Sequence, residues 1–185
     1  VQLVGASVLE SVDVFTSVGT QGRGQLLLDS GARASLGDVY VGERSGGDGL
    51  IAVRNGALLE TAGSVLLSAS GALEMENGRA EIGKLYVDGG RATADGGTLR
   101  AESIVLNEVS SPAAQLLLSG NAVAETRELL LGRGATLELA DSARCLVTQS
   151  MKLLPGATLR LHVGEGASLT LADGASCVAG GTDHG

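Results

Sequence analysis

Large aromatic side chains are almost missing from this chain of 185 residues, which has one Phe, two Tyr and no Trp. A compact globular protein usually fills part of its core with aromatic rings. Here Leu, Val and Ala supply the apolar mass, and Gly contributes 29 residues, about twice its usual share. This composition favours a narrow, regular interior in which every layer has the same width.

Basic clusters and long hydrophobic runs are missing as well. The net charge of −8 argues against a nucleic-acid partner, because phosphate binding needs a basic face. No apolar stretch approaches the roughly 20 residues of a membrane-spanning helix, so we expect no membrane insertion. An apolar content of 44% excludes a disordered chain. The chain begins at Val1 without a signal peptide, and we expect that its N-terminus was cut.

A pattern of two apolar residues flanking a third recurs through the chain, at intervals of about 19 to 25 residues. The flanking residues of these first triplets are Leu26/Leu28, Ile51/Val53, Leu73/Met75, Ala92/Ala94, Leu116/Leu118, Leu137/Leu139 and Leu159/Leu161. A second triplet follows each first one: Val39/Val41, Val65/Leu67, Leu85/Val87, Ile104/Leu106, Leu129/Leu131 and Met151/Leu153. Turns rich in Gly, Asn and Asp separate them, such as "DSGA", "RNGA" and "DGGT".

The alternation within each triplet has a period of two residues, which indicates strands. Strands this short are stable only when each coil stacks on the next. A third and smallest face would come from segments such as "ARASL" (32–36) and "NAVAE" (121–125). We therefore predict an all-β, single-stranded β-helix (β-solenoid) of about 7–8 coils of roughly 22 residues with three faces. Residues 1–185 would form one domain without a clear capping helix. A β-sandwich is the alternative, but it requires neither the repeat nor the scarcity of aromatic rings.

The segment "YVGERSGGDGLIAVRNGALLETAGSVLLSASGALEMENG", from Tyr40 to Gly78, carries a family resemblance. It resembles the Gly-rich β-helix repeats of autotransporter passengers. It resembles more closely the type V secretion and PEP-CTERM-associated repeats of bacterial surface proteins. The resemblance implies an exported bacterial protein, extracellular or at the cell surface, and implies no particular activity.

Many β-helices act on polysaccharides, but this sequence carries no clear catalytic or metal-binding pattern of that kind. Such enzymes need clustered carboxylates or a calcium site. The acidic residues here are scattered, and Glu74 and Glu138 are expected to be solvated surface charges three coils apart. "GGDG" (46–49) matches a calcium-binding repeat only once and is expected to be a plain turn. His162 is expected to face solvent, and His184 lies in a polar tail. We predict no enzyme, no catalytic residue, no metal and no cofactor.

The two cysteines, Cys145 and Cys177, end similar segments, "GATLELADSARC" and "GASLTLADGASC". Three interpretations follow: two small buried residues, a disulfide bond within the chain, or bonds between subunits. The spacing of 32 residues is nearer one and a half coils than one, which disfavours the bond within the chain.

The middle residues of the second triplets form the most informative set. They should point outward and stack in register down one face of the rod. Five of them are apolar: Tyr40, Leu66, Tyr86, Val105 and Leu130. Monomers avoid such a continuous apolar patch, so we predict a lateral interaction stripe. Two alternatives are that another segment of the chain covers it, and that a slip of one residue reverses the faces.

Three functions are compatible with these features. The first is an exported structural protein that forms a fibre, stalk or surface layer as a homo-oligomer or filament. Its coils would stack end to end, since an uncapped β-helix leaves both ladders open, unless further repeats of a longer parent chain flank it. The second is an adhesin-type passenger that presents a binding face to a cell-surface or polysaccharide partner. The third, a polysaccharide-active enzyme, lacks the required carboxylate cluster.

Overall fold

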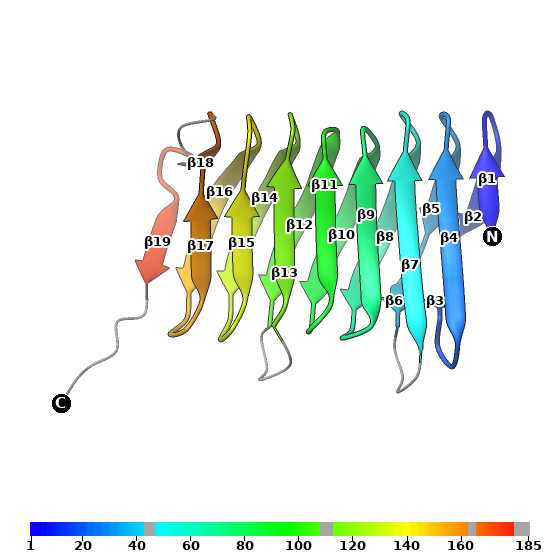
Figure 1. The fold of residues 1–185 in the computed structure, drawn as a ribbon, viewed down its shortest axis with the longest axis horizontal. Coiled ribbons are helices and arrows are strands. Elements are labelled where there is room, and N and C mark those ends of the chain that lie inside the picture. Colours follow the sequence, from blue (N-terminus) through cyan, green and yellow to red (C-terminus); the bar gives the residue numbers. More distant parts are fainter. Residues whose placement is uncertain (43–46, 108–112, 163–165, 180–185) are drawn as a thin grey trace.

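The computed structural model describes residues 1–42, 47–107, 113–162 and 166–179, and in these residues it contains strands and no helix. Paired strands run parallel and stack as a β-solenoid of about 7 turns of roughly 23 residues, which confirms the predicted fold class (Figure 1). Parallel pairing follows from the repeat, because each turn of the chain returns in the same direction over the previous one.

Two sheets run the length of the rod. The first, sheet A, forms the front of Figure 1. Its strands follow one another in chain order: β1 (Gln2–Val4), β4 (Arg23–Asp29), β7 (Asp48–Arg54), β9 (Gly71–Glu76), β11 (Arg91–Asp95), β13 (Gln115–Ser119), β15 (Thr136–Leu139) and β17 (Thr158–Leu161).

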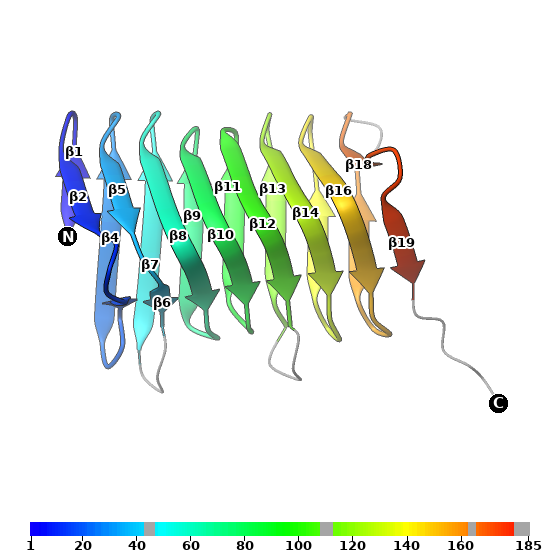
Figure 2. The ribbon, with the colours of Figure 1, turned by 180° about the vertical axis from the view of Figure 1, so that it is seen from behind.

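The second, sheet B, covers the opposite face (Figure 2). Its main path contains β2 (Val8–Ser11), β5 (Arg33–Leu36), β8 (Leu58–Leu67), β10 (Arg79–Val87), β12 (Thr98–Leu106), β14 (Val123–Leu131), β16 (Arg144–Leu153) and β18 (Ser168–Leu171). Three short strands belong to the same sheet: β3 (Thr16–Val18), β6 (Val39–Val41) and β19 (Ser176–Ala179).

Each long strand of sheet B has two arms. The first arm of β8 pairs with β5 and its second arm pairs with β6. Between the arms the pairing of β10 with β8 shifts register, at Ile82/Lys84, and that of β14 with β16 shifts at Thr126/Glu128. The three predicted faces are therefore separate strands in the first turns, as β4, β5 and β6. From β8 to β16 the second and third faces join into one continuous strand.

The core is a column of aliphatic side chains between the two sheets. The flanking residues of the triplets point inward as predicted; Leu26, Leu28, Val39 and Val41, for example, are all buried. Between them lie the outward residues, so the in/out phase predicted from the sequence is correct and the alternative of a one-residue slip is wrong. Small residues such as Ala34 and Ala80 complete the column along the first arm.

Corner residues turn the chain from sheet A toward sheet B in the left-handed conformation. Asn55 and Asn77 adopt φ angles of 50° and 52°, and each is followed by Gly. Asn tolerates this region because its side chain can bond locally. Asn55 Nδ2 also donates to Asp29 Oδ1 at 2.8 Å in the previous turn. This hydrogen bond is the main reason why the pKa of Asp29 lies below its ordinary value.

Candidate interaction surface

The five predicted stripe residues lie in one unbroken line across the second arm of sheet B. The ladder aligns Tyr40 with Leu66, Leu66 with Tyr86, Tyr86 with Val105, and Val105 with Leu130. Beyond Leu130 the line continues to Lys152 and ends at Val178 of β19. We call the seven positions from Tyr40 to Val178 the stripe. Sequence reasoning thus placed all five residues side by side, one per turn.

Stripe residues keep part of their surface in contact with solvent. Tyr40, Leu66, Tyr86, Val105 and Leu130 are all half-buried, whereas their neighbours in the strands are buried. Phe15, which precedes β3 and is 70% exposed, packs edge-on against Tyr40 with ring centroids 6.1 Å apart. Two of the three aromatic residues of the stripe region are therefore in contact, and Phe15 extends the apolar surface toward the first turn.

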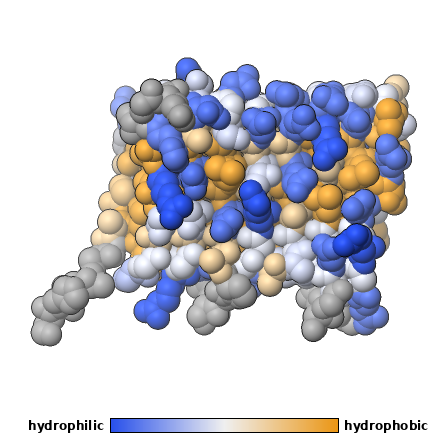
Figure 3. Space-filling view, viewed as in Figure 1, coloured by the Kyte–Doolittle hydropathy of each residue, from blue (hydrophilic) through white to orange (hydrophobic). Residues whose placement is uncertain are grey.

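Sheet A presents a different surface, on which hydrophilic and hydrophobic side chains are mixed (Figure 3). Glu74 lies 3.9 Å from Arg54, and Glu138 lies 3.6 Å from Arg160. The two glutamates are surface charges as expected, and the structure adds an arginine partner to each. His162 is exposed as predicted, with Nε2 3.1 Å from Glu138 Oε1. These exposed ion pairs contribute little to stability.

A groove runs along the bend of sheet B, and sequence reasoning missed it. Its volume is about 820 Å³, and its walls come from the first arm and the bend of β8, β10, β12, β14 and β16, with Val12, Ser35 and Leu36 added from the first turns. Glu60, Glu81, Arg100 and Glu125 line it from consecutive turns. The signal was present in the outward positions of the third face, which read Ser35, Glu60, Glu81, Arg100, Glu125 and Leu146. Only the bend, however, makes this line concave.

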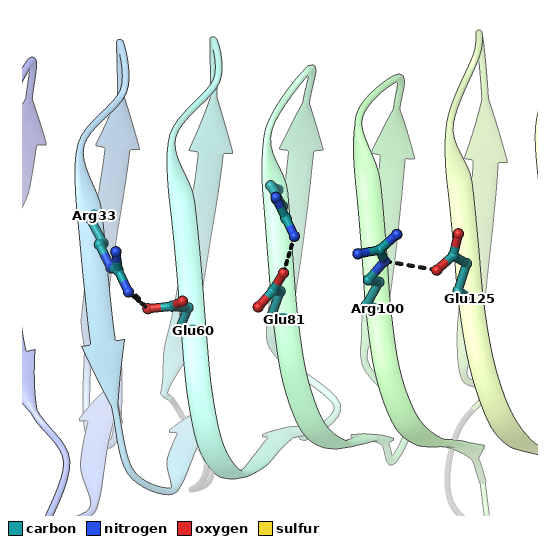
Figure 4. A network of polar contacts seen from close by, with 6 residues as sticks. Arg33, Glu60, Glu81, Arg100 and Glu125 are labelled. Atoms are coloured by element: carbon teal, nitrogen blue, oxygen red, sulfur yellow. Dashed lines mark hydrogen bonds and ion pairs between the residues drawn. The ribbon is translucent and has the colours of Figure 1, made fainter.

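Arginines hold the three carboxylates of this line (Figure 4). Arg33 Nε donates to Glu60 Oε2 at 2.9 Å, and Arg100 Nε donates to Glu125 Oε2 at 2.7 Å. Glu81 is paired with Arg79 of its own strand. Across residues 1–42, 47–107, 113–162 and 166–179, no three His, Cys, Asp or Glu side chains converge as metal ligands would. The groove is lined by charged and aliphatic side chains together, and arginines neutralise three of its carboxylates.

The "GGDG" segment and His184 are two further candidates from the sequence, and the structure describes only part of them. The expectation of a plain turn at "GGDG" is wrong for its second half, because Asp48 and Gly49 begin strand β7 and pair with Arg23 and Gly24 of the previous turn. Asp48 also accepts a hydrogen bond from Arg23 at 3.1 Å, so it is engaged in an ion pair between turns. Gly46 of that segment and His184 lie outside the described residues.

The two cysteines occupy different arms of sheet B. Cys145 is buried in the first arm and aligns with Leu169 of β18, whereas Cys177 is exposed on β19 and aligns with Met151. Both thiols are free, so the disulfide bond within the chain, one of three interpretations of the sequence, does not form in the structure. The reason is that Cys177 lies one turn further on and in the other arm: the last turn divides into β18, which pairs with the arm that holds Cys145, and β19, which carries Cys177.

We expect the two thiols to differ sharply in reactivity. Burial raises the pKa of Cys145 to about 12, so its reactive thiolate is scarce at neutral pH. A thiol reagent at pH 8 should label one cysteine per native chain, at Cys177, and label Cys145 only after denaturation. Mass spectrometry of the labelled peptides measures this, with Cys177→Ser as the control. Rapid labelling of Cys145 in the native Cys177→Ser chain would contradict the packing described.

Comparison of the chain with protein-family models, with curated proteins and with solved structures gave no match in any of the three. The described part of the chain contains no helix long and apolar enough to span a bilayer. The fold is that of a β-solenoid, and its function is inferred from the surfaces above.

Proposed function

We propose that this chain is a structural subunit of an exported bacterial assembly, a β-solenoid that builds a fibre, stalk or surface layer. Lateral contact along the stripe and end-to-end stacking of coils would hold the subunits together. The observation that carries the proposal is the unbroken register of half-buried apolar residues from Tyr40 to Leu130. The resemblance to repeats of bacterial surface proteins supports export. No enzymatic activity is assigned; arginines engage three carboxylates of the groove, those of Glu60, Glu81 and Glu125.

The two end turns support the stacking contact. Leu161 is 38% exposed although its ladder neighbour Leu139 is fully buried, and Leu171 is 36% exposed beside the buried Val147. These are inward positions whose outer side lacks a further coil in the structure. All large hydrophobic residues that are exposed in the described ranges lie in these end turns: Val1, Val4, Val8, Val12, Val14, Phe15, Leu161, Leu171 and Val178. A further coil at either end, from a second copy or from flanking repeats of a longer chain, would bury them and extend both ladders.

The double substitution Leu66→Ser and Tyr86→Ser tests the lateral contact. We expect it to weaken self-association at least about tenfold, because each side chain contributes about 1.5–3 kcal/mol when buried. Sedimentation velocity over a concentration series measures the association, and negative-stain microscopy shows whether filaments or sheets form. Leu117→Ser, an outward apolar residue of sheet A, is the matched control and should leave association unchanged. A wild-type chain that remains strictly monomeric at high concentration, without filaments, would refute the proposal.

An adhesin-type passenger is the second candidate, and the groove is the observation that favours it. The groove is elongated along the rod and lined by charged and hydroxyl-bearing side chains, including Thr126 and Thr148. Such a lining suits hydrogen bonding to an extended polar polymer such as a polysaccharide. Negative-stain images that show isolated short rods rather than assemblies would favour this candidate.

A further inference from the structure

A ladder of polar residues, mostly serines, runs beside the stripe on the second arm of sheet B. Its members precede the stripe residues from Leu66 to Val178 by two positions and are aligned from turn to turn: Ser64, Lys84, Ser103, Glu128, Ser150 and Ser176. Lys84 and Glu128 are the two charged members. They have opposite sign and stand one turn to either side of Ser103. We call this row the serine ladder.

We propose that a second copy of this chain docks face to face on the stripe with its long axis antiparallel, about a two-fold axis that lies in the interface over Val105 and parallel to β12. This inference rests on the proposed function and specifies its lateral contact. A two-fold interface is self-complementary, so residues on either side of the axis must match one another. Rotation about this axis exchanges the turn of β10 with the turn of β14. Lys84 then faces Glu128 of the second copy, and Glu128 faces Lys84 of the second copy.

The same two-fold rotation also brings the stripe residues of the two copies into matching positions. Val105 lies on the axis and meets Val105 of the second copy, while Tyr86 meets Leu130 and Tyr40 meets Val178. Lys152 falls opposite Leu66, against which its aliphatic stem can pack while the ammonium group reaches solvent. The apolar stripe supplies buried area, and the two Lys–Glu contacts fix the register and direction.

Lys84 and Glu128 are available for this role. Both side chains are exposed, and within the described residues neither takes part in an ion pair. The first arm of the same strands is different, since its charges are engaged in the pairs Arg79–Glu81 and Arg100–Glu125. Lys84 and Glu128 can therefore both form ion pairs with a second copy.

A parallel arrangement of the two copies matches the surface less well. Each stripe residue would then meet its own equivalent, which brings Lys152 against Lys152 of the second copy. Lys84 would meet Asp88 on the far side of the stripe, but Asp88 Oδ1 is a buried oxygen without a hydrogen-bond partner in the structure. Like charges in contact oppose association. The antiparallel arrangement is therefore the one we infer.

Charge-reversal variants of the full chain test the arrangement. Lys84→Glu alone places two Glu–Glu contacts in the interface, and Glu128→Lys alone places two Lys–Lys contacts. Each variant should weaken self-association at least about tenfold by sedimentation velocity. An equimolar mixture of the two variants should associate within about threefold of wild type, because both contacts are then Glu–Lys. Arg91→Glu, which reverses the charge of an exposed residue on sheet A, is the control and should associate as wild type does.

The outcomes separate this inference from the proposed function. Restored association in the mixture supports the antiparallel contact and shows that both variants are folded. If the wild type associates but the mixture stays dissociated, or neither single variant weakens association, the inference is overturned and the proposed function stands. Rescue of Lys84→Glu by Asp88→Lys would likewise overturn it in favour of the parallel arrangement. A monomeric wild type would overturn both.

Discussion

Replacing Leu118 by Ala is expected to lower the free energy of unfolding by about 2–5 kcal/mol. Leu118 is fully buried and stands in the sheet A ladder between Ala94 and Leu139. Ala94, its neighbour in the preceding turn, is small, so the Leu118 side chain fills core space that Ala94 leaves open. Removal leaves a cavity in a column whose backbone ladders hold the walls apart, which favours the upper part of this range.

Urea unfolding followed by circular dichroism measures this effect, and Leu117→Ala is the matched control. Leu117 is the next residue of the same strand, points outward and is half-buried. The same chemical change there should cost less than about 1 kcal/mol. Equal losses at the two positions would show that β13 does not alternate between core and solvent as described.

Gly132→Ala is expected to destabilise the chain by about 3 kcal/mol or more, because a side chain there would overlap backbone. A Cβ at this position would lie 1.5 Å from the carbonyl oxygen of Asn107 and 2.5 Å from its carbonyl carbon. Gly132 N also donates to Leu106 O at 2.7 Å, and the buried Asn107 side chain donates to Arg133 O at 3.2 Å. Relief of the overlap must therefore move two turns apart and weaken both bonds.

Thermal unfolding measures this loss, which corresponds to a fall in Tm of about 6–12 °C for a chain of this size. Gly22→Ala is the control, since a Cβ at Gly22 would have no atom within 4 Å and its backbone is not in the left-handed region. That change should stay within about 0.5 kcal/mol of wild type. An unchanged Tm for Gly132→Ala would mean that the turn after β14 is looser than the structure shows.

The fold and the stripe were predictable from sequence because both depend on alternation along single strands. Successive side chains of a strand point to opposite faces, so Leu26 and Leu28 point inward while Leu27 between them points outward. Stacking repeats this alternation in each turn. Once the repeat fixes which residues align, Tyr40, Leu66 and Tyr86 must lie in one line. No knowledge of the bend or of the loops is needed for that conclusion.

The groove and the cysteine positions were not predictable in this way. The inward residues of the first arm include small ones such as Ala34, Ala80 and Ala124, whose apolar signal is weak beside that of the Leu triplets. The concave surface at Gly83 depends on the angle between the two arms, which alternation does not encode. The spacing of 32 residues already placed Cys177 well beyond one coil from Cys145, but the arm on which Cys177 lies depends on how the last turn divides between β18 and β19, which the two similar local segments did not indicate.

Each turn contacts only its two neighbouring turns, so the number of turns can vary independently of the rest of the structure. Gain or loss of one whole repeat would change the rod by one strand spacing, about 4.8 Å, and leave the cross-section intact. The stripe would grow or shrink by one rung at the same time. If copies adhere along the stripe as proposed, a single number, the count of repeats, sets both the reach of the rod and the strength of its lateral contact.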